Sequence, residues 1–288
     1  MLSLLRIGHA MSNPVITAAM VPALISLAVA AGQEVLAVYA TDFDVMRKAD
    51  ASSVTDADHR AEAVILAGLA KIAPGIPVVA EEEAAAGRVP ETEAQFFLVD
   101  PLDGTREFIC RNGEFTVNIA LIENGISVMG VVYAPALGTL YAGTLGVGAV
   151  KAQVRDGVAG PLEPITARAA PREKIAAIGS RANGADATQA WLARLPIGSF
   201  VSAGSSLKFC LLAEGAADVY PRLGRTMEWD TAAGDAVLAA AGGIVTQLDG
   251  ARLLYGKCRQ TADAPYANPH FVAYGDPRLA KAVADLPG

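Results

Sequence analysis

Two hydrophobic patterns divide the chain into a first and a second part. In the first part, apolar or alternating runs at 115–122, 126–133 and 140–142 are separated by Glu123-Asn124-Gly125 and Ala136-Leu137-Gly138. Such runs, with turn residues between them, are typical of strands that pair antiparallel as a meander. In the second part, short apolar runs alternate with helical periodicity, which indicates a mixed or parallel layered sheet. The elements expected there are strands at 175–178, 200–201, 218–220, 243–246 and 271–274 and helices at 185–195, 205–215, 230–241 and 277–285.

Before the meander, acidic residues follow or open regular elements. The segment from Val54 to Asp58 leads into apolar positions at helical spacing that end before Pro74-Gly75, which predicts a helix with a capped, acidic entry. The run 77–80 predicts a strand that ends at Glu81-Glu82-Glu83, and the run 96–99 predicts a strand that ends at Asp100. A rigid scaffold of this kind can aim several carboxylates into one cleft.

A polar, proline-rich segment at about 155–172 has neither helical nor strand periodicity and separates the two patterns. We therefore expect an N-terminal α+β lobe at residues 1–168, which holds most of the candidate metal ligands. A C-terminal α/β lobe at residues 169–288 then holds Asp230 and the substrate contacts.

The stretch from Ile7 to Gln33 is long enough for a membrane span, since His9 is its one titratable residue. Pro14, Pro22 and several polar residues dilute its hydrophobicity, and no basic region with a cleavage site marks a signal peptide. We expect a buried core helix and no stable membrane insertion.

Composition narrows the function classes. The 288 residues are 52% hydrophobic and 18% charged, which favours a globular chain over a disordered one. The net charge of -7 and the lack of a basic cluster argue against a nucleic-acid partner. Isolated cysteines at 110, 210 and 258 lack disulfide or zinc spacing, so we expect reduced thiols and a cytoplasmic protein, with peripheral contact to the inner membrane left open.

The strongest chemical signal is Asp100-Pro101-Leu102-Asp103-Gly104-Thr105. Two carboxylates three residues apart across a tight turn can converge on hard cations, while the Gly-Thr step leaves N–H groups free to face an anion. The ordinary alternative is a strand-end turn whose aspartates cap backbone groups. Four such fixed letters recur by chance only about once per 10⁵ positions, which favours the functional interpretation.

Two weaker signals join it. Asp230, in Trp229-Asp230-Thr231-Ala232-Ala233-Gly234, has the position of an ordinary helix N-cap, and Glu81-Glu82-Glu83 by itself reads as a solvated acidic turn. Together with the first motif they predict a carboxylate cluster.

The chain has only three histidines, without metal-ligand pairing, so oxygen-ligated magnesium is favoured over zinc. There is no phosphate-binding P-loop, and Gly146-Val147-Gly148 is interpreted as a turn.

The order of these motifs, from Val54-Thr55-x-x-Asp58 through Glu81-Glu82 to the two longer motifs, resembles the inositol-monophosphatase-like superfamily of lithium-sensitive, magnesium-dependent phosphatases. The resemblance spans about residues 13 to 285. The segments 204–210 and 217–222 are similar to the 3'(2'),5'-bisphosphate nucleotidase (CysQ-type) branch. Members of that branch remove the 3'-phosphate from adenosine 3',5'-bisphosphate, a by-product of sulfate assimilation.

The resemblance implies a layered αβαβα sandwich, with an antiparallel sheet in the N-terminal lobe and a mixed sheet in the C-terminal lobe. It also implies a role for each matching residue. Two or three Mg²⁺ ions would be held by Glu81, Asp100, the main-chain oxygen of Leu102, Asp103 and Asp230. The attacking water would be activated by Thr105, oriented by Asp58, with help from Glu81. The substrate would contact Gly104, Thr105, Ser180, Gly204, Ser205, Lys208, Arg222 and Asp230.

One position departs from the branch. The segment 178–183 ends in Asn183 where the branch commonly has a substrate-facing histidine, and Asn cannot carry charge.

The expected activity is removal of the 3'-phosphate of adenosine 3',5'-bisphosphate, and its sulfated analogue stays open as a substrate. One alternative is an inositol- or sugar-phosphate phosphatase of the same superfamily, and another is a non-catalytic phosphate-binding protein. The expected partner is a small phosphorylated molecule, and a homodimer stays open.

Overall fold

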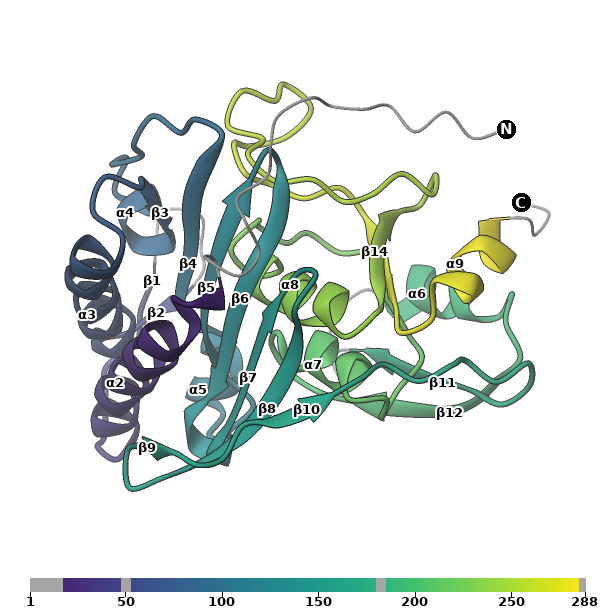
Figure 1. Ribbon diagram of the computed structural model, residues 1–288, viewed down its shortest axis with the longest axis horizontal. Coiled ribbons are helices and arrows are strands. Elements are labelled where there is room, and N and C mark those ends of the chain that lie inside the picture. The colour runs from purple at the N-terminus through teal and green to yellow at the C-terminus, as the bar shows by residue number, and fades with distance from the viewer. Residues whose placement is uncertain (1–17, 48–52, 180–184, 285–288) are drawn as a thin grey trace.

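Five layers stack in the order helix, sheet, helix, sheet, helix in the computed structural model (Figure 1). The structure describes residues 18–47, 53–179 and 185–284. This arrangement confirms the layered sandwich that the resemblance implies.

The first sheet has strand order β10-β8-β7-β6-β5-β4-β3, with β9 paired to β8. All its pairs are antiparallel except that of β3 with β4. Its strands are β3 (Val78–Ala80), β4 (Gln95–Asp103), β5 (Thr116–Glu123), β6 (Ile126–Ala134), β7 (Thr139–Thr144), β8 (Gly148–Arg155), β9 (Val158–Ala159) and β10 (Glu163–Ile165). The expected meander is therefore confirmed as β5, β6 and β7, and the glycine-containing segment 145–147 is the turn between β7 and β8.

The second sheet is mixed, in the order β12-β11-β13-β15-β14. Strands β12, β11 and β13 are parallel, and β15 pairs antiparallel with β13 and β14. Its strands are β11 (Ile175–Gly179), β12 (Ile197–Ser202), β13 (Val219–Arg222), β14 (Ile244–Gln247) and β15 (Phe271–Tyr274). A separate pair, β1 (Met46–Arg47) and β2 (Ser53–Val54), precedes the first long sheet in the chain.

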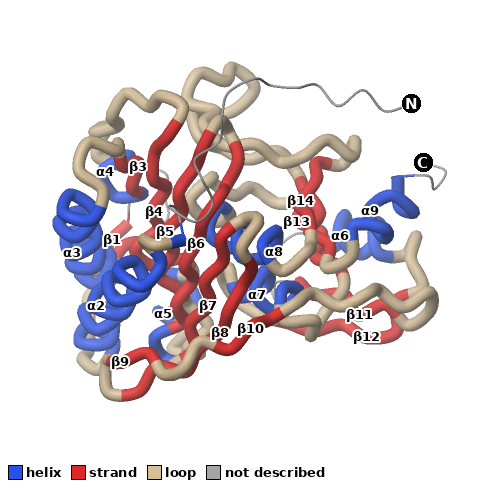
Figure 2. Tube along the Cα trace, viewed as in Figure 1, coloured by secondary structure: helices blue, strands red, loops and turns tan. Residues whose placement is uncertain are grey.

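Helices cover both sheets, as the coloured trace in Figure 2 makes plain. Helices α2 and α3 cover the outer face of the first sheet, α7 and α8 lie between the sheets, and α6 and α9 lie beyond the second sheet. The helices are α2 (Val21–Tyr39), α3 (Asp56–Ile72), α4 (Glu81–Ala85), α5 (Thr105–Ile109), α6 (Ala185–Leu192), α7 (Leu207–Ala213), α8 (Ala232–Ala240) and α9 (Pro277–Ala284). A short 3₁₀ turn, η1 (Pro135–Leu137), joins β6 to β7.

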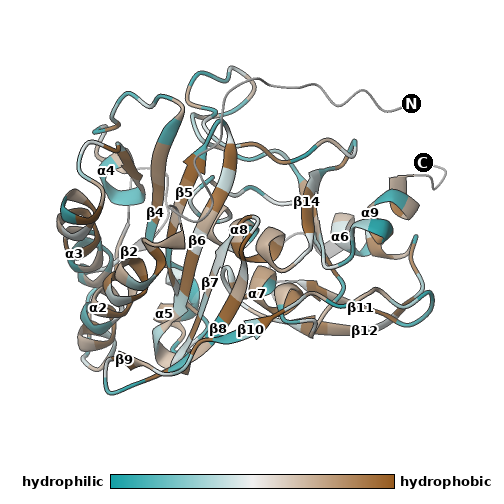
Figure 3. Ribbon diagram, in the orientation of Figure 1, coloured by the Kyte–Doolittle hydropathy of each residue, from teal (hydrophilic) through white to brown (hydrophobic). Residues whose placement is uncertain are grey.

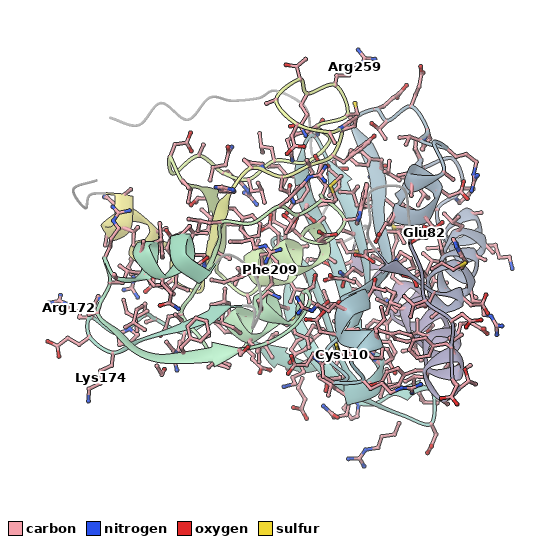
Figure 4. The ribbon with its side chains drawn as sticks, turned by 180° about the vertical axis from the view of Figure 1, so that it is seen from behind. Glu82, Cys110, Arg172, Lys174, Phe209 and Arg259 are labelled. Carbon is pink, nitrogen blue, oxygen red and sulfur yellow. The ribbon has the colours of Figure 1, made fainter. Side chains whose placement is uncertain are left out.

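The middle helix layer is shared by the two sheets. One buried cluster joins side chains of β4, β5 and β6 to those of α7, α8 and β15, and Phe209 lies near the centre of the molecule (Figure 4). Helix α8 approaches the first sheet so closely that a Cβ added at Gly143 would lie 2.7 Å from Cα of Val237. A Cβ at Gly130 would collide with the carbonyl oxygen of Ala233. These contacts fix the start of α8, and with it Asp230, against the first sheet.

Helix α2 is the expected core helix. It has the length and apolar composition of a membrane span, but more than half of it is buried inside the protein. Its buried side chains, including Leu24, Ala28 and Val35, share a core cluster with Val117 and Ile119 of β5. Figure 3 shows the apolar colouring of the strands that this layer covers. The part of the 7–33 stretch before residue 18 lies outside the described residues.

One expectation from the sequence was wrong in part. The segment 155–172 contains the short strands β9 and β10, because the chain turns at 156–157, β9 pairs with the end of β8, and β10 then also pairs with β8. The proposed boundary after residue 168 falls in the connection between β10 and β11, where the chain leaves the first sheet for the second.

Candidate active site

The Asp100–Thr105 motif lies where β4 passes into α5. Strand β4 continues through Asp103 rather than ending at Asp100, with an irregular register against β5 between these two residues. Gly104 then adopts a left-handed conformation (φ 89°) as the residue before α5, a conformation that glycine tolerates best. The first N–H groups of a helix have no carbonyl acceptor within it; in α5 that of Glu107 bonds to its own carboxylate, so the N–H groups of Thr105 and Arg106 remain candidates for facing an anion.

The carboxylate of Asp103 is held by groups from both sheets. Its Oδ2 accepts hydrogen bonds from the hydroxyl of Ser205 at 2.6 Å and from the N–H of Ser206 at 2.8 Å. The side-chain amide of Asn118, on β5, donates to the same oxygen at 3.3 Å. Asp103 of the first sheet is therefore bonded directly to the segment that opens α7.

Ser205 has two close oxygen neighbours. Besides Asp103, its hydroxyl lies 2.5 Å from the hydroxyl of Thr116, which also donates to Oδ1 of Asn118 at 2.9 Å. The backbone of Ser205 is in the left-handed region (φ 52°), where residues other than glycine are uncommon and often functional. Gly204, just before it, donates its N–H to Glu114 at 2.8 Å.

Asp230 precedes α8 by two residues and lies across the cleft from β4. Its Oδ2 accepts the N–H of Met227 at 2.8 Å, and its carbonyl oxygen accepts the hydroxyl of Ser206 at 2.7 Å. Thr231 occupies the N-cap position of α8, so the ordinary N-cap alternative for Asp230 does not hold. The side chain of Asp230 instead accepts a hydrogen bond within its own turn, and Thr231 has the N-cap position of α8.

Glu81 begins α4 directly after β3, as predicted. The first turn of α4 is anchored by Glu62 of α3, whose carboxylate accepts the N–H groups of Glu82 at 2.8 Å and Glu83 at 3.0 Å. Burial is the main cause that raises the pKa of Glu62 to about 7. Glu81 is thus the first residue of a short helix whose position α3 determines.

The four predicted carboxylate ligands act on one another electrostatically. Burial raises the pKa of Asp100 well above its usual range, and the charges of Glu81, Asp103 and Asp230 raise it further. Burial raises the pKa of Asp230 in the same way, followed by the charges of Asp103 and Glu81. A site of this sign favours a cation, because bound positive charge relieves the repulsion.

The side chains do not form a ready coordination shell. Over residues 18–47, 53–179 and 185–284, no group of three or more His, Cys, Asp or Glu side chains is gathered tightly enough to hold a metal ion as it stands. Protein donors hold three of the carboxylates: Asp100 accepts the N–H of Leu102 at 3.0 Å, and Asp103 and Asp230 have the partners given above. The predicted metal ligands therefore lie within electrostatic reach of one another, and their role stays a prediction.

A cleft of about 120 Å³ lies between the two sheets beside these residues. It brings together six of the predicted site residues, and it does not include Glu81, Asp100 or Thr105 in its walls. The walls are formed by Asp103, Gly104, Glu107, Ser205, Lys208, Phe209, Tyr220, Arg222, Thr226, Asp230 and Thr231.

Two cations face this cleft. Lys208 is buried, and its ammonium donates to the carbonyl of Ser205 at 2.5 Å and lies over the ring of Tyr220. Burial lowers the pKa of Lys208 to about 8, against the raising effect of Asp103. Arg222 donates to the carbonyl of Arg225 at 3.1 Å, and its Nε is buried without a hydrogen-bond partner in the described chain.

The predicted pair of Thr105 and Asp58 is not hydrogen-bonded here. The hydroxyl of Thr105 donates to the carbonyl of Leu102 at 3.4 Å. Asp58 forms a capping box with Thr55, accepting both its N–H and its hydroxyl at 2.8 Å. Burial is the main cause that raises the pKa of Asp58 to about 7, and the charges of Glu82 and Glu81 add to it. Asp58 therefore lies within electrostatic reach of the acidic turn.

Several residues of the site went unnoticed in the sequence. Asn118 and Ser206 are buried polar residues that bond to the predicted ligands, and Glu228 is fully buried and accepts the N–H groups of Gly256 at 2.6 Å and Lys257 at 2.8 Å. The usable signal was a polar residue inside an apolar run, as at Asn118. The predicted Ser180 and the unusual Asn183 lie outside the described residues.

Comparisons with known proteins agree with this geometry. Residues 17–279 match the inositol monophosphatase family. A protein of Escherichia coli O157:H7 named 3'(2'),5'-bisphosphate nucleotidase CysQ is 45% identical over 243 residues, which cover 84% of this chain and 94% of the relative. A Salmonella typhimurium protein of the same name is 46% identical over the same coverage.

Solved structures show the same fold. CysQ of Bacteroides thetaiotaomicron, described as a bacterial member of the inositol monophosphatase family, has a TM-score of 0.73 and 36% identity, covering 91% of this chain and 98% of that one. A Thermotoga maritima IMPase has a TM-score of 0.71 at 24% identity, with 91% and 96% of the two chains covered, and this likeness concerns the fold alone. The family match covers most of the sequence, and the relatives match over nearly their whole length. The chain belongs to the inositol monophosphatase family.

Proposed function

We propose that this protein is a magnesium-dependent phosphatase that removes the 3'-phosphate of adenosine 3',5'-bisphosphate by transfer to water. The observation that carries the proposal is the position of Lys208 and Arg222 in the same cleft as Asp103 and Asp230. A carboxylate cluster serves the reacting phosphate through cations, and the two basic side chains serve a second phosphate that does not react. The nucleotidase name of the CysQ relatives supports the same substrate.

Lys208 retains donor capacity for a ligand. An ammonium group has three N–H donors, and the carbonyls of Ser205, at 2.5 Å, and Ala203, at 3.4 Å, use two of them. The third is available toward the cleft that Lys208 lines. We infer that Lys208 both holds the Gly204-Ser205 turn and contributes positive charge to substrate binding.

Arg222 has a simpler role. Its guanidinium donates to the carbonyl of Arg225, and its unpartnered Nε leaves part of the group unsatisfied. Burying such a donor without a partner is costly, so an anionic ligand oxygen in the cleft is a favourable partner. We infer that Arg222 binds the phosphate that does not react.

The residues fit magnesium by donor chemistry. Glu81, Asp100, Asp103 and Asp230 supply carboxylate oxygens, Leu102 supplies a main-chain oxygen, and hard oxygen donors suit Mg²⁺. Burial is the main cause that raises the pKa of Asp100 and of Asp230, and the neighbouring carboxylates add to it, so a bound divalent ion would favour the ionised forms. Bound Mg²⁺ would supply Lewis-acid activation of the phosphate and of water.

The chain itself orients the phosphate. We infer that N–H groups at the start of α5, after Gly104, donate to phosphate oxygens, and that the hydroxyl of Thr105, whose hydrogen bond to the carbonyl of Leu102 is long at 3.4 Å, holds the attacking water. Both hydrogen bonds from Thr55 go to Oδ2 of Asp58, so we infer that Oδ1 is the oxygen that would orient Thr105.

Turnover on three substrates tests the proposal: adenosine 3',5'-bisphosphate, inositol 1-phosphate and fructose 1,6-bisphosphate. The expected order has adenosine 3',5'-bisphosphate first by kcat/KM, with no turnover in the presence of a chelator. Preference for inositol 1-phosphate would instead support the monophosphatase alternative. Absence of phosphate release from all three would support the non-catalytic alternative.

A further inference from the structure

A buried polar cluster joins the two predicted metal-ligand residues Asp103 and Asp230. Its members are Thr116 and Asn118 on β5 and Ser206 before α7, and each side chain is at most 1% exposed. Along β5, Val117 and Ile119 face α2 and α3, whereas Ala120 packs on the inner face. Because side chains alternate along a strand, Thr116 and Asn118 face inward with Ala120.

Ser206 is the residue that contacts both sides of the site. Its N–H donates to Oδ2 of Asp103 at 2.8 Å, and its hydroxyl donates to the carbonyl oxygen of Asp230 at 2.7 Å. The amide of Asn118 donates to the Ser206 hydroxyl at 3.0 Å and to Asp103 at 3.3 Å. These four hydrogen bonds form a continuous path that links Asp103 on β4, through Ser206 and Asn118, to Asp230 in the segment before α8.

The path bridges elements from different sheets. Asp103 belongs to the first sheet, Ser206 opens a helix of the middle layer, and Asp230 leads into α8. Mg²⁺ requires near-ideal octahedral geometry, so the separation of two ligating residues controls its affinity. A group that bonds to both residues is in a position to set that separation.

We propose that Ser206, supported by Asn118, is a positioning residue that sets the spacing of Asp103 and Asp230 and thereby the affinity of the site for divalent cations. The inference rests on the proposed function, since it assumes that these two residues ligate the ion. Groups that orient metal ligands typically change metal affinity by roughly 10- to 100-fold when they are removed.

Ser127 offers a matched control. It is also 1% exposed, and its hydroxyl donates to the carbonyl of Ala232 at 2.7 Å, so it ties the same α8 segment to the first sheet. Ser127 has no contact with Asp103. The substitutions Ser206→Ala and Ser127→Ala both remove a buried hydroxyl that donates to a carbonyl at the start of α8. Ser206→Ala also removes the acceptor of Asn118, and only Ser206→Ala removes bonds within the path between the two ligands.

The experiment measures binding of Mn²⁺ to metal-free full-length protein by electron paramagnetic resonance, with the melting temperature recorded for each variant. Ser206→Ala and Asn118→Ala are expected to raise the Kd for Mn²⁺ by roughly 10-fold or more, and Ser127→Ala is expected to leave it unchanged at a similar loss of melting temperature. An unchanged Kd in both Ser206→Ala and Asn118→Ala, or an equal rise in Ser127→Ala, would overturn the positioning role while leaving the proposed function intact. Failure of the wild-type protein to bind Mn²⁺ would overturn both. If Ser206→Ala does not fold, Asn118→Ala decides the matter.

Discussion

Glu62 and Glu82 are joined across two helices, because Oε2 of Glu62 on α3 accepts the N–H of Glu82 in the first turn of α4 at 2.8 Å. The other oxygen accepts the N–H of Glu83 at 3.0 Å, so one carboxylate satisfies two N–H groups at a helix start. No motif or spacing in the sequence singles out Glu62. Its effect is to hold α4, and hence Glu81, against α3.

Glu62→Ala should therefore destabilise the protein and reduce its activity. Each N–H left without an acceptor costs about 1–3 kcal/mol, and the loosened α4 would move Glu81. Urea unfolding gives the first effect, and the Mg²⁺ concentration for half-maximal turnover gives the second. Arg60→Ala is the control on the same helix, since its exposed ion pair with Asp56 should contribute under about 1 kcal/mol. Equal effects of the two substitutions would contradict the anchoring role.

Asp230→Asn should abolish most turnover and still leave the fold intact. Asn keeps an oxygen that can accept the N–H of Met227, but it removes a negative charge from the site. We expect kcat to fall on the order of 10²- to 10³-fold at saturating Mg²⁺. The melting temperature in the presence of a chelator should rise, because burial and like charges destabilise the ionised Asp230. The exposed Asp249→Asn is the matched control, and near-normal turnover in Asp230→Asn would contradict the assignment.

Arg222→Ala and Lys208→Ala should separate two roles. The loss of Arg222 removes a charge-assisted contact of about 1.5–3 kcal/mol, so kcat/KM for adenosine 3',5'-bisphosphate should fall roughly 10- to 150-fold. Inositol 1-phosphate should be much less affected. Lys208→Ala should impair both substrates, because Lys208 also holds the carbonyl of Ser205. Steady-state kinetics on both substrates check this, and an equal loss on both in Arg222→Ala would indicate a structural role instead.

Asp235 should make stability depend on pH. Burial raises its pKa from 3.8 to about 6, while Arg252 and the hydroxyl of Tyr255, 3.0 Å away, oppose the rise. A carboxyl whose pKa is higher in the folded state stabilises the fold fully below its unfolded pKa, and this contribution is lost as pH rises through about 6. Asp235→Asn lacks this titrating group. The free energy of unfolding of the variant minus that of the wild type should therefore rise by about 3 kcal/mol from pH 3.5 to pH 7. Urea unfolding at a series of pH values measures this difference, and parallel curves of unfolding free energy against pH for the two proteins would contradict the prediction.

Gly143→Ala should destabilise the protein through backbone crowding. The new Cβ would lie 2.7 Å from Cα of Val237, so strand β7 and helix α8 would have to move apart. Overpacking of this kind costs about 1–3 kcal/mol. Gly275→Ala is the control, since its nearest neighbours are 3.6 Å away, an ordinary contact distance. Similar melting temperatures for both variants would show that the α8 contact is compliant.

The sequence predicted the elements that carry the acidic residues better than the bonds between them. Periodicity located β3, β5 and α3, and the Asp100–Thr105 motif indicated a turn because its Pro and Gly restrict the backbone. Strand β4 ran beyond Asp100 because pairing of Asp103 with Thr116 outweighs the proline at 101. Propensity alone does not report such tertiary pairing.

The partners of the candidate site were harder to foresee. Ser206 and Asn118 lie far apart in the chain, and their role depends on two sheets meeting through a shared helix layer. The bond between Asp58 and Thr55 was visible as a capping pattern, but the absence of a bond to Thr105 was not, because capping competes for the same carboxylate. Lys208 read as a surface cation on its own, and only the tertiary structure buries it beside Tyr220.

The hydroxyl of Ser205 has two oxygens within reach, Oδ2 of Asp103 at 2.6 Å and Oγ1 of Thr116 at 2.5 Å, and one proton to give. Rotation about its Cα–Cβ and C–O bonds can redirect that proton from the carboxylate to Thr116, whose own proton already points to Asn118. Asp103 can then turn an oxygen toward a new partner while no hydroxyl in the row is left without an acceptor. A row of three hydrogen-bonded side chains thus lowers the cost of changing the coordination of one carboxylate in a buried site, with each hydroxyl keeping its own proton.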